Sequence, residues 1–352
     1  MQYLHPDVWS GVSTYLRAED IGILCSSNHR ICRHILNRTT RLSYSKRVTF
    51  LFQRFPNLNT LICSTWQHGV NLSSLPNTLT VLSLPEDYML RHDDLCNLPL
   101  SLTSLNLKSN NKITDEGLPY LPHFLTSLNL KSNKITDEGL TYLPRYLTYL
   151  NLYSNKNITD GGNSYLPACL TSLNLAGNYK ITDEGLANLP RLLTSLSLQS
   201  NKITDEGLPY LPRDLTYLNL YRNDKITDDG VHDLPPSLTS LELHRNNKIT
   251  DAGVADFPRS PTFLDLHSNE NITDDAVRNL PRSLTSLNLC CNNKITDEGV
   301  AGFPRSLTSL FLDSNNQITD TGLSHLPPFL ISLNLGENEN ITDTGVARFL
   351  VP

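Results

Sequence analysis

The chain has 352 residues, with 29 Lys and Arg against 35 Asp and Glu and a formal net charge of -6. Phosphate recognition needs clustered basic side chains, so this composition argues against a nucleic-acid partner. No apolar run approaches the roughly 20 residues of a membrane-spanning helix, and the N-terminus lacks a basic start followed by an apolar stretch, so we expect neither membrane association nor a secretory leader. The seven cysteines are scattered without metal or disulfide spacing, which favours a reducing compartment.

The first 40 residues predict a compact helical module. Apolar side chains recur there at helical spacing, at Val8, Val12, Tyr15, Leu16, Ile21, Leu24, Ile31 and Ile35. The simplest role for such a module is a cap that shields the core of the structure that follows it.

A second interpretation of this module comes from its order of residues. L-x-P-[DE]-V-W over residues 4–9, then Tyr15-Leu16 and Asp20-Ile21, resembles the F-box, a three-helix motif that docks onto the adaptor of SCF ubiquitin ligases. Ser27, Asn28 and Ile31 depart from the Val-Cys and aromatic residues usual there. The resemblance implies an adaptor-binding surface made by Leu4, Pro6, Asp7, Val8, Trp9, Tyr15, Leu16, Asp20 and Ile21.

A polar and basic stretch follows the module, and it includes NRTTRLSYSKR from Asn37. This composition predicts a solvated junction rather than a binding patch. The expected organisation is therefore a module over residues 1–40, a junction over 41–57 and a repeat domain over 58–352.

The repeat domain copies one unit many times. The equivalent leucines Leu102, Leu125 and Leu147 are 23 and 22 residues apart, and each unit reads L-x-x-L-x-L-x-x-N. This pattern resembles the leucine-rich repeat, and its ITDEGL phrase resembles repeats attached to F-boxes, although the period is shorter than the roughly 26 residues common there. The resemblance implies an α/β solenoid with a curved parallel sheet and short convex helices.

Each position in the unit has an expected structural role. In SLNLK from Ser104, alternation predicts a short strand with Leu105 and Leu107 facing inward. Thr114 is expected to cap a short helix whose dipole favours the acidic residues that follow it. The asparagine after each strand is expected to turn inward and satisfy backbone groups: Asn110, Asn133, Asn155, Asn178, Asn201, Asn223, Asn246, Asn269, Asn292, Asn315 and Asn338.

The outward strand positions vary, and they carry the information about a ligand. Most copies place Ser or Asn there, whereas three neighbouring repeats carry aromatic and charged side chains, which are common at interface hot spots. An earlier aromatic pair, Tyr149 and Tyr153, occupies corresponding positions. We therefore predict that a protein target binds through Tyr149, Tyr153, Tyr217, Tyr221, Arg222, Glu242, His244, Arg245, Phe263, Asp265 and His267.

Three other interpretations of these residues are open. The surface could simply be amphipathic, without a ligand. Glu242, His244, Asp265 and His267 could form a metal cluster, although a flat sheet converges ligands poorly. A catalytic histidine and carboxylate pair has the same weakness and lacks an accompanying nucleophile motif. We therefore expect no enzymatic activity, no cofactor and no metal.

Together these features predict a substrate-recognition subunit that links a protein target to an SCF-type ubiquitin ligase through its adaptor and cullin complex. The alternative is a non-catalytic leucine-rich-repeat scaffold or sensor, in which the N-terminal helices only cap the solenoid. The expected location is the cytoplasm, with the nucleus or the cytosol of a host cell left open.

Overall fold

The computed structural model describes residues 41–44, 55–63, 72–86, 90–109, 112–199 and 202–349. They fall into two compact units, residues 1–157 with 165–170, and residues 158–164 with 171–352. The F-box-like module at 1–40 and its adaptor-binding residues lie outside the described residues and stay a prediction. Within the described ranges, no helix has the length and apolar character needed to cross a bilayer.

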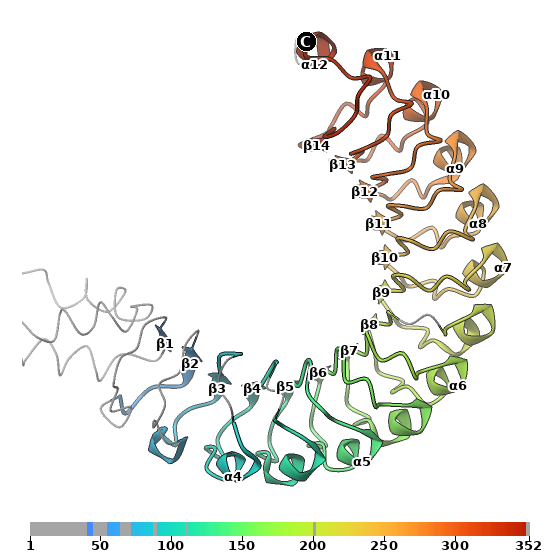
Figure 1. The fold of residues 1–352 in the computed structure, drawn as a ribbon. Coiled ribbons are helices and arrows are strands. Elements are labelled where there is room, and N and C mark those ends of the chain that lie inside the picture. Colours follow the sequence, from blue (N-terminus) through green and yellow to red (C-terminus); the bar gives the residue numbers. More distant parts are fainter. Residues whose placement is uncertain are drawn as a thin grey trace, which may run out of the picture. The chain divides into compact units, whose positions relative to one another are not determined.

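Both units are built from short parallel strands joined by short helical turns (Figure 1). In the first unit the strands, in sheet order, are β1 (Arg41–Tyr44), β2 (Thr60–Cys63), β3 (Val81–Ser83), β4 (Ser104–Asn106), β5 (Ser127–Asn129) and β6 (Tyr149–Asn151). Its helical turns are η2 (Leu72–Ser74), α4 (His92–Leu95), η3 (Asp115–Tyr120) and α5 (Asp137–Leu140). The turn η4 (Asp160–Tyr165) spans the boundary between the units.

The second unit repeats this plan. Its strands are β7 (Ser172–Asn174), β8 (Ser195–Ser197), β9 (Tyr217–Asn219), β10 (Ser240–Glu242), β11 (Phe263–Asp265), β12 (Ser286–Asn288), β13 (Ser309–Phe311) and β14 (Ser332–Asn334). Its helical turns are α6 (Asp183–Leu186), η5 (Asp205–Tyr210), α7 (Asp228–Val231), α8 (Asp251–Ala255), α9 (Asp274–Asn279), α10 (Asp297–Val300), α11 (Asp320–Leu323) and α12 (Asp343–Phe349). The strand pairs from β7 to β14 are parallel and place equivalent residues opposite one another, which confirms the predicted leucine-rich-repeat architecture.

The sheet of the first unit starts earlier than composition indicates. Strand β1 lies inside the stretch predicted as a solvated junction and pairs with β2, with Leu42 opposite Leu61. Leu42 is buried. Apolar and polar residues alternate over only two positions around Leu42, and the surrounding sequence is basic. The sequence therefore carries no periodic pattern that predicts this strand.

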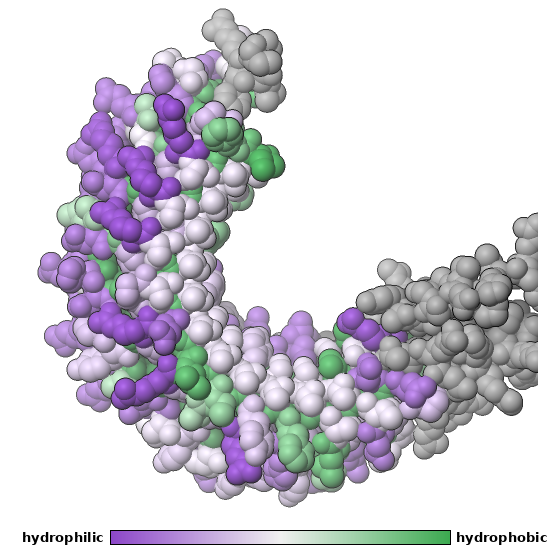
Figure 2. Space-filling view, turned by 180° about the vertical axis from the view of Figure 1, so that it is seen from behind, coloured by the Kyte–Doolittle hydropathy of each residue, from purple (hydrophilic) through white to green (hydrophobic). Residues whose placement is uncertain are grey.

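The core of each unit consists of leucine rows between the sheet and the helical turns. Leu241, Leu264 and Leu287 are fully buried and lie directly opposite one another on β10, β11 and β12. In each unit the strands line one side and the helical turns cover the other (Figure 1). Figure 2 shows one face of the molecule, on which hydrophilic and hydrophobic residues are mixed.

The inward asparagines behave as predicted wherever the structure describes them. Asn269, for example, is fully buried; its Nδ2 donates to the Leu243 carbonyl of the preceding repeat at 3.1 Å, and its Oδ1 accepts from the Asn246 amide at 2.6 Å. The side chain thus bridges two repeats where the chain leaves the sheet. Asn110 and Asn201 lie outside the described residues.

The T-D-x-G phrase links neighbouring repeats, a role that helix capping alone does not explain. Asp205 accepts hydrogen bonds from the amide and the hydroxyl of Thr227, one repeat later, at 2.8 and 2.7 Å. Gly230 follows that threonine, and a Cβ built on it would lie 2.1 Å from the Asp205 carboxylate. The same Asp-to-Thr pair recurs along the chain, for example from Asp297 to Thr319. The threonine of some repeats also caps its own helix, since Thr227 Oγ1 accepts from the Asp229 amide at 3.3 Å, whereas Thr114 stands at the N-cap position without the expected side-chain hydrogen bond.

A left-handed residue precedes the buried asparagine in many repeats. Positive φ values of 55 to 61° occur at Ser109, Ser132, Ser154, Arg222, Arg245, Ser268, Cys291, Ser314 and Glu337, and Gly177 takes 76°. The amide of this residue donates to the next repeat, as from Ser132 to the Tyr153 carbonyl at 2.7 Å. The left-handed turn therefore carries the chain out of the sheet while keeping its ladder paired.

Candidate interaction surface on strands β9 to β11

Six of the predicted target-binding residues form one continuous group in the second unit. We call this group the β9–β11 cluster: Tyr217, Tyr221, Glu242, His244, Asp265 and His267. Parallel register makes it possible, because Asn219, Glu242 and Asp265 lie directly opposite one another at the ends of three adjacent strands. Side chains at equivalent positions of neighbouring repeats are therefore separated by about one strand spacing, roughly 4.8 Å.

Three rings of the cluster form a stack. Tyr221, His244 and His267 each stand two residues beyond a strand end. The Tyr221 and His244 centroids are 4.1 Å apart at 25°, and the His244 and His267 centroids are 4.3 Å apart at 17°. Strand spacing thus sets the ring spacing, and the stack is held by the backbone as well as by ring contact.

Glu242 anchors one edge of the cluster. Its Oε1 accepts from the Tyr217 hydroxyl at 2.9 Å, and its Oε2 accepts from Asn219 Nδ2. Burial raises the pKa of the Glu242 carboxyl, partly offset by the Tyr217 hydrogen bond. Burial likewise raises the pKa of the Tyr217 phenol. Tyr217 is therefore tied within the cluster and presents little free hydrogen-bonding capacity.

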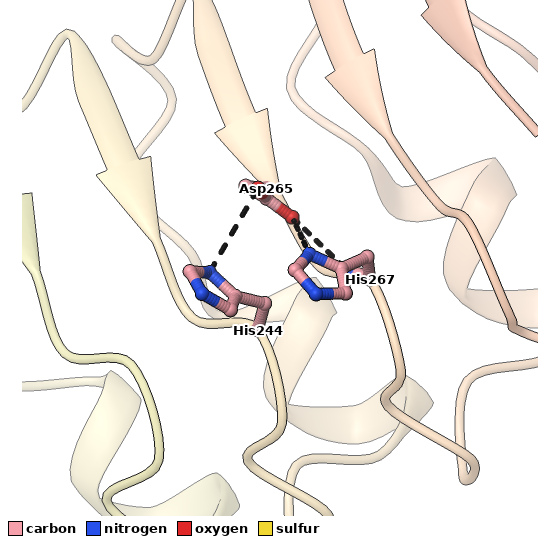
Figure 3. Close-up of side chains that lie close together, drawn as sticks. All are labelled: His244, Asp265 and His267. Atoms are coloured by element: carbon pink, nitrogen blue, oxygen red, sulfur yellow. Dashed lines mark hydrogen bonds and ion pairs between the residues drawn. The ribbon is translucent and has the colours of Figure 1, made fainter. Parts of the chain in front are cut away.

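Asp265 lies between the two histidines (Figure 3). Its Oδ1 is 3.0 Å from His267 Nδ1 and accepts from the His267 amide at 3.0 Å. Its Oδ2 accepts from Asn288 Nδ2 at 3.2 Å and lies 3.8 Å from His244 Nδ1. Burial acts to raise the pKa of this carboxyl, but the His267 hydrogen bonds outweigh it and the pKa is lowered, so Asp265 is ionised at neutral pH.

His244 is the least satisfied member. Its Nδ1 is buried and has no hydrogen-bond partner. Burial lowers the pKa of His244 to about 4, although the nearby Asp265 carboxylate opposes this. His244 is therefore a neutral imidazole at physiological pH, with an uncommitted ring nitrogen facing a carboxylate.

The other predicted residues lie around this group without joining it. Phe263 is half-buried on β11 beside Ser240 and Ser286. Arg222 and Arg245 are exposed left-handed residues, and the Arg222 guanidinium lies 5.7 Å from the Tyr221 ring centroid. Their charges therefore rim the stack.

Tyr149 and Tyr153 belong to the first unit and form a separate small surface there. Tyr149 is exposed, and the Lys131 ammonium lies 4.6 Å from the Tyr153 ring centroid. Phe124 and Tyr146, two further exposed aromatic residues of this unit, stack with centroids 6.3 Å apart. These contacts are local to the first unit.

The outward asparagines at the strand ends have a structural function that the sequence analysis did not predict. Asn219 Oδ1 accepts from the Tyr221 amide at 2.9 Å, and Asn288 Oδ1 accepts from the Cys290 amide at 3.1 Å. Asp265 makes the same bond to His267. The recurrence of asparagine at this position was the signal in the sequence that could have predicted this function. These hydrogen bonds fix the backbone from which the stacked rings project.

Comparison with a family model decides the family. The model described as Leucine Rich repeat matches ten segments that together cover more than half of the chain: 100–121, 122–143, 144–166, 167–189, 190–211, 212–234, 235–257, 281–303, 304–326 and 327–350. The chain belongs to the leucine-rich repeat family. This fold is a scaffold for protein interaction.

Solved leucine-rich-repeat structures resemble the chain over most of its length. An internalin (InlF) from Listeria monocytogenes is 26% identical with a TM-score of 0.55, covering 95% of this chain and 92% of its own. Rad7, in a yeast complex of Rad7 and Elc1, is 18% identical with a TM-score of 0.58, covering 97% and 90%. The latter likeness shows the fold alone. No curated protein matches the chain.

One repeat inside the matched region escapes the family model. Residues 258–280 lie between two matched segments, and they contain Phe263, Asp265 and His267. The core leucines Leu264 and Leu266 of this repeat are nevertheless fully buried. The repeat thus keeps the buried leucine row although the family model does not match it.

Proposed function

We propose that the β9–β11 cluster is the surface through which this leucine-rich-repeat protein binds a protein target. The observation that carries the proposal is the stacked row of Tyr221, His244 and His267, in which the His267 ring is also hydrogen-bonded to Asp265. Rings already fixed in place lose little conformational freedom on binding, so more of their contact energy is available for affinity. The stack contains a tyrosine and arginines lie at its rim, and both side-chain types are enriched at binding hot spots.

The target-binding surface is tested by capture and substitution. Full-length protein immobilised as bait should retain a target that mass spectrometry identifies. Tyr221→Ala and Phe263→Ala should then each weaken the purified interaction by about 2 kcal/mol, the usual threshold for a hot spot. Tyr210→Ala is the matched control, because Tyr210 is exposed on the helical turn η5, away from the strands. Equal affinities for all three variants would place the target elsewhere.

We further propose that the protein is the target-recognition subunit of an SCF-type ubiquitin ligase. The support is the resemblance of LHPDVW and the following YLRAEDI to the F-box, combined with the leucine-rich repeats after it. In this proposal the catalytic chemistry belongs to the partner enzymes of the cullin complex. The protein itself would work in the cytoplasm.

Adaptor binding separates this proposal from a scaffold whose N-terminal helices only cap the solenoid. Purified SCF adaptor should co-elute with the full chain at micromolar concentration. Pro6→Ala and Val8→Ala should reduce that binding while leaving the thermal midpoint of the repeats unchanged. If the adaptor does not co-elute, and the same substitutions lower the thermal midpoint, the cap interpretation replaces the ligase proposal.

A further inference from the structure

We propose that His244, Asp265 and His267 bind one divalent transition-metal ion, for which Zn²⁺ is the probe of choice. One ligand atom from each residue lies within 4.8 Å of the others. Figure 3 shows the two imidazoles and the carboxylate gathered at the ends of neighbouring strands. This inference does not depend on any protein target, and it revises the expectation that a sheet converges such ligands poorly.

The spacing of the donor atoms suits a small ion. Tetrahedral zinc bound at about 2.0–2.1 Å separates its ligand atoms by roughly 3.4 Å. Here His267 Nδ1 is 3.0 Å from Asp265 Oδ1, and His244 Nδ1 is 3.8 Å from Asp265 Oδ2. These two distances involve different oxygens of the Asp265 carboxylate. The His244 and His267 rings are stacked at an interplanar angle of 17°, so metal binding requires the rings to rotate out of the stack until both Nδ1 lone pairs point at one ion.

The unpaired nitrogen of His244 is the second observation. Its Nδ1 is buried, lacks a hydrogen-bond partner and faces Asp265 at a distance too long for a hydrogen bond. Buried polar atoms without partners are rare and costly, and a metal ion would use this lone pair. His267 Nδ1 can also bind the ion, in the tautomer that carries its proton on Nε2.

Surrounding contacts orient the ligands as outer-shell groups do at known metal sites. Asn288 Nδ2 donates to Asp265 Oδ2 at 3.2 Å, and the His267 amide donates to Oδ1 at 3.0 Å. These bonds hold the carboxylate between the rings. His267 remains about a quarter exposed, so the ion would keep a coordination position open toward solvent.

The test uses full-length protein stripped with a chelator. Titration calorimetry with Zn²⁺ should show saturable binding of one ion per chain. Titration with Co²⁺ should give ligand-field absorption without the intense sulfur-to-metal charge-transfer bands that cysteine ligands produce. Absence of saturable binding would overturn the proposal.

Variants assign the binding to these residues. His244→Gln and His267→Gln remove one ligand each and should weaken Zn²⁺ affinity by more than about 100-fold, whereas Asn288→Ala should cost about 10-fold as an outer-shell change. His325→Ala and the double change Cys290→Ser with Cys291→Ser are controls that keep the site intact. Circular dichroism melts verify that each variant is folded.

Two outcomes would assign the metal elsewhere. Unchanged affinity in both folded histidine variants would show that the ion does not use this group. Loss of binding in the cysteine variant, with thiolate bands in the Co²⁺ spectrum, would identify a different site.

Discussion

At the residue scale, many repeats contain one residue in the strained left-handed backbone conformation, at the point where the chain turns out of the sheet. A non-glycine residue in the left-handed region costs roughly 1–2 kcal/mol, yet Ser132, Arg222 and Arg245 all adopt it. Gly177 shows that the position also accepts the residue with no such penalty. For Arg222 and Arg245 the same geometry sets charged side chains at the rim of the β9–β11 cluster.

Exchange at this position should therefore change stability in opposite directions. Ser132→Gly should stabilise the protein by up to about 1 kcal/mol, because relief of strain exceeds the greater freedom of glycine in the unfolded chain. Gly177→Ser should destabilise it by a similar amount. Urea unfolding midpoints provide the measurement, and a loss of stability in Ser132→Gly would contradict the role assigned to the turn.

Acid should destabilise the metal-free protein through His244. The folded-state pKa near 4 lies below the ordinary 6.5, so between these values the unfolded chain binds a proton that the folded protein excludes. Stability is therefore lost as pH falls from about 6.5 to 4, by roughly 2–3 kcal/mol from this group, with no further loss below. Comparing unfolding free energies of wild type and His244→Gln across this range isolates the effect. Parallel pH curves for the two proteins would rule it out.

At the element scale, many of the short helices from η3 onward begin with an aspartate that also bonds to the following repeat. Asp205 lies in the first turn of η5, yet both carboxylate oxygens accept from Thr227 of the following repeat. Gly230 provides the space for this carboxylate. Ala276 occupies the corresponding place in α9, where Asp251 still binds Thr273, so the hydrogen bonds persist even beside a methyl group. The aspartate-to-threonine pair is therefore a recurring contact between neighbouring helical turns.

Asp205 and Glu206 offer a matched pair for testing this role. Both sit in the same first helical turn and would interact with the helix dipole, but Glu206 is exposed. Asp205→Ala should cost about 2–3 kcal/mol, because two hydrogen bonds to a charged group are lost. Glu206→Ala should cost about 0.5 kcal/mol or less. Similar losses for the two variants in denaturant unfolding would favour the dipole explanation instead.

At the scale of the whole molecule, each unit is a row of repeats in which contacts run between neighbours. The Asn269 side chain both donates a hydrogen bond to the preceding repeat and accepts one from it. Asp251 joins its own helical turn to the following repeat through a hydrogen bond from Thr273. Stability in such a row is approximately a sum of repeat and neighbour terms. Function, in contrast, is concentrated where three particular repeats adjoin.

Register-preserving deletions should separate these two properties. Removing residues 304–326, one complete repeat, rejoins equivalent positions and should leave a folded protein with its Zn²⁺ affinity unchanged. Removing residues 258–280 should also leave a folded protein, but without Zn²⁺ binding, because Asp265 and His267 are lost. Circular dichroism and calorimetry measure both results. Zinc binding that survives the second deletion would contradict the assigned ligands.

The sequence by itself determined the repeat, the buried rows and the family. Leucines at fixed spacing specify a strand with one buried face, and equivalent asparagines after each strand specify the turn. Leu264 and Asn269 are buried as this pattern predicts. The roles of these positions can be predicted from sequence because every repeat packs against its neighbours in the same way, so the same residue type recurs at each equivalent position.

Only the tertiary structure decided which outward residues meet and how. His244 lies 23 residues after Tyr221, and His267 lies 23 residues after His244. Only parallel register brings the centroids of successive rings to 4.1 and 4.3 Å from each other. The pairing of Tyr217 with Glu242, and the link from Asp205 to Thr227, likewise depend on contacts between repeats. Strand β1 was missed for the same reason, because its pairing with β2, rather than any local periodicity, makes it a strand. A sequence records which side chains face outward, whereas side-chain rotamers and strand register fix the distances on which binding depends.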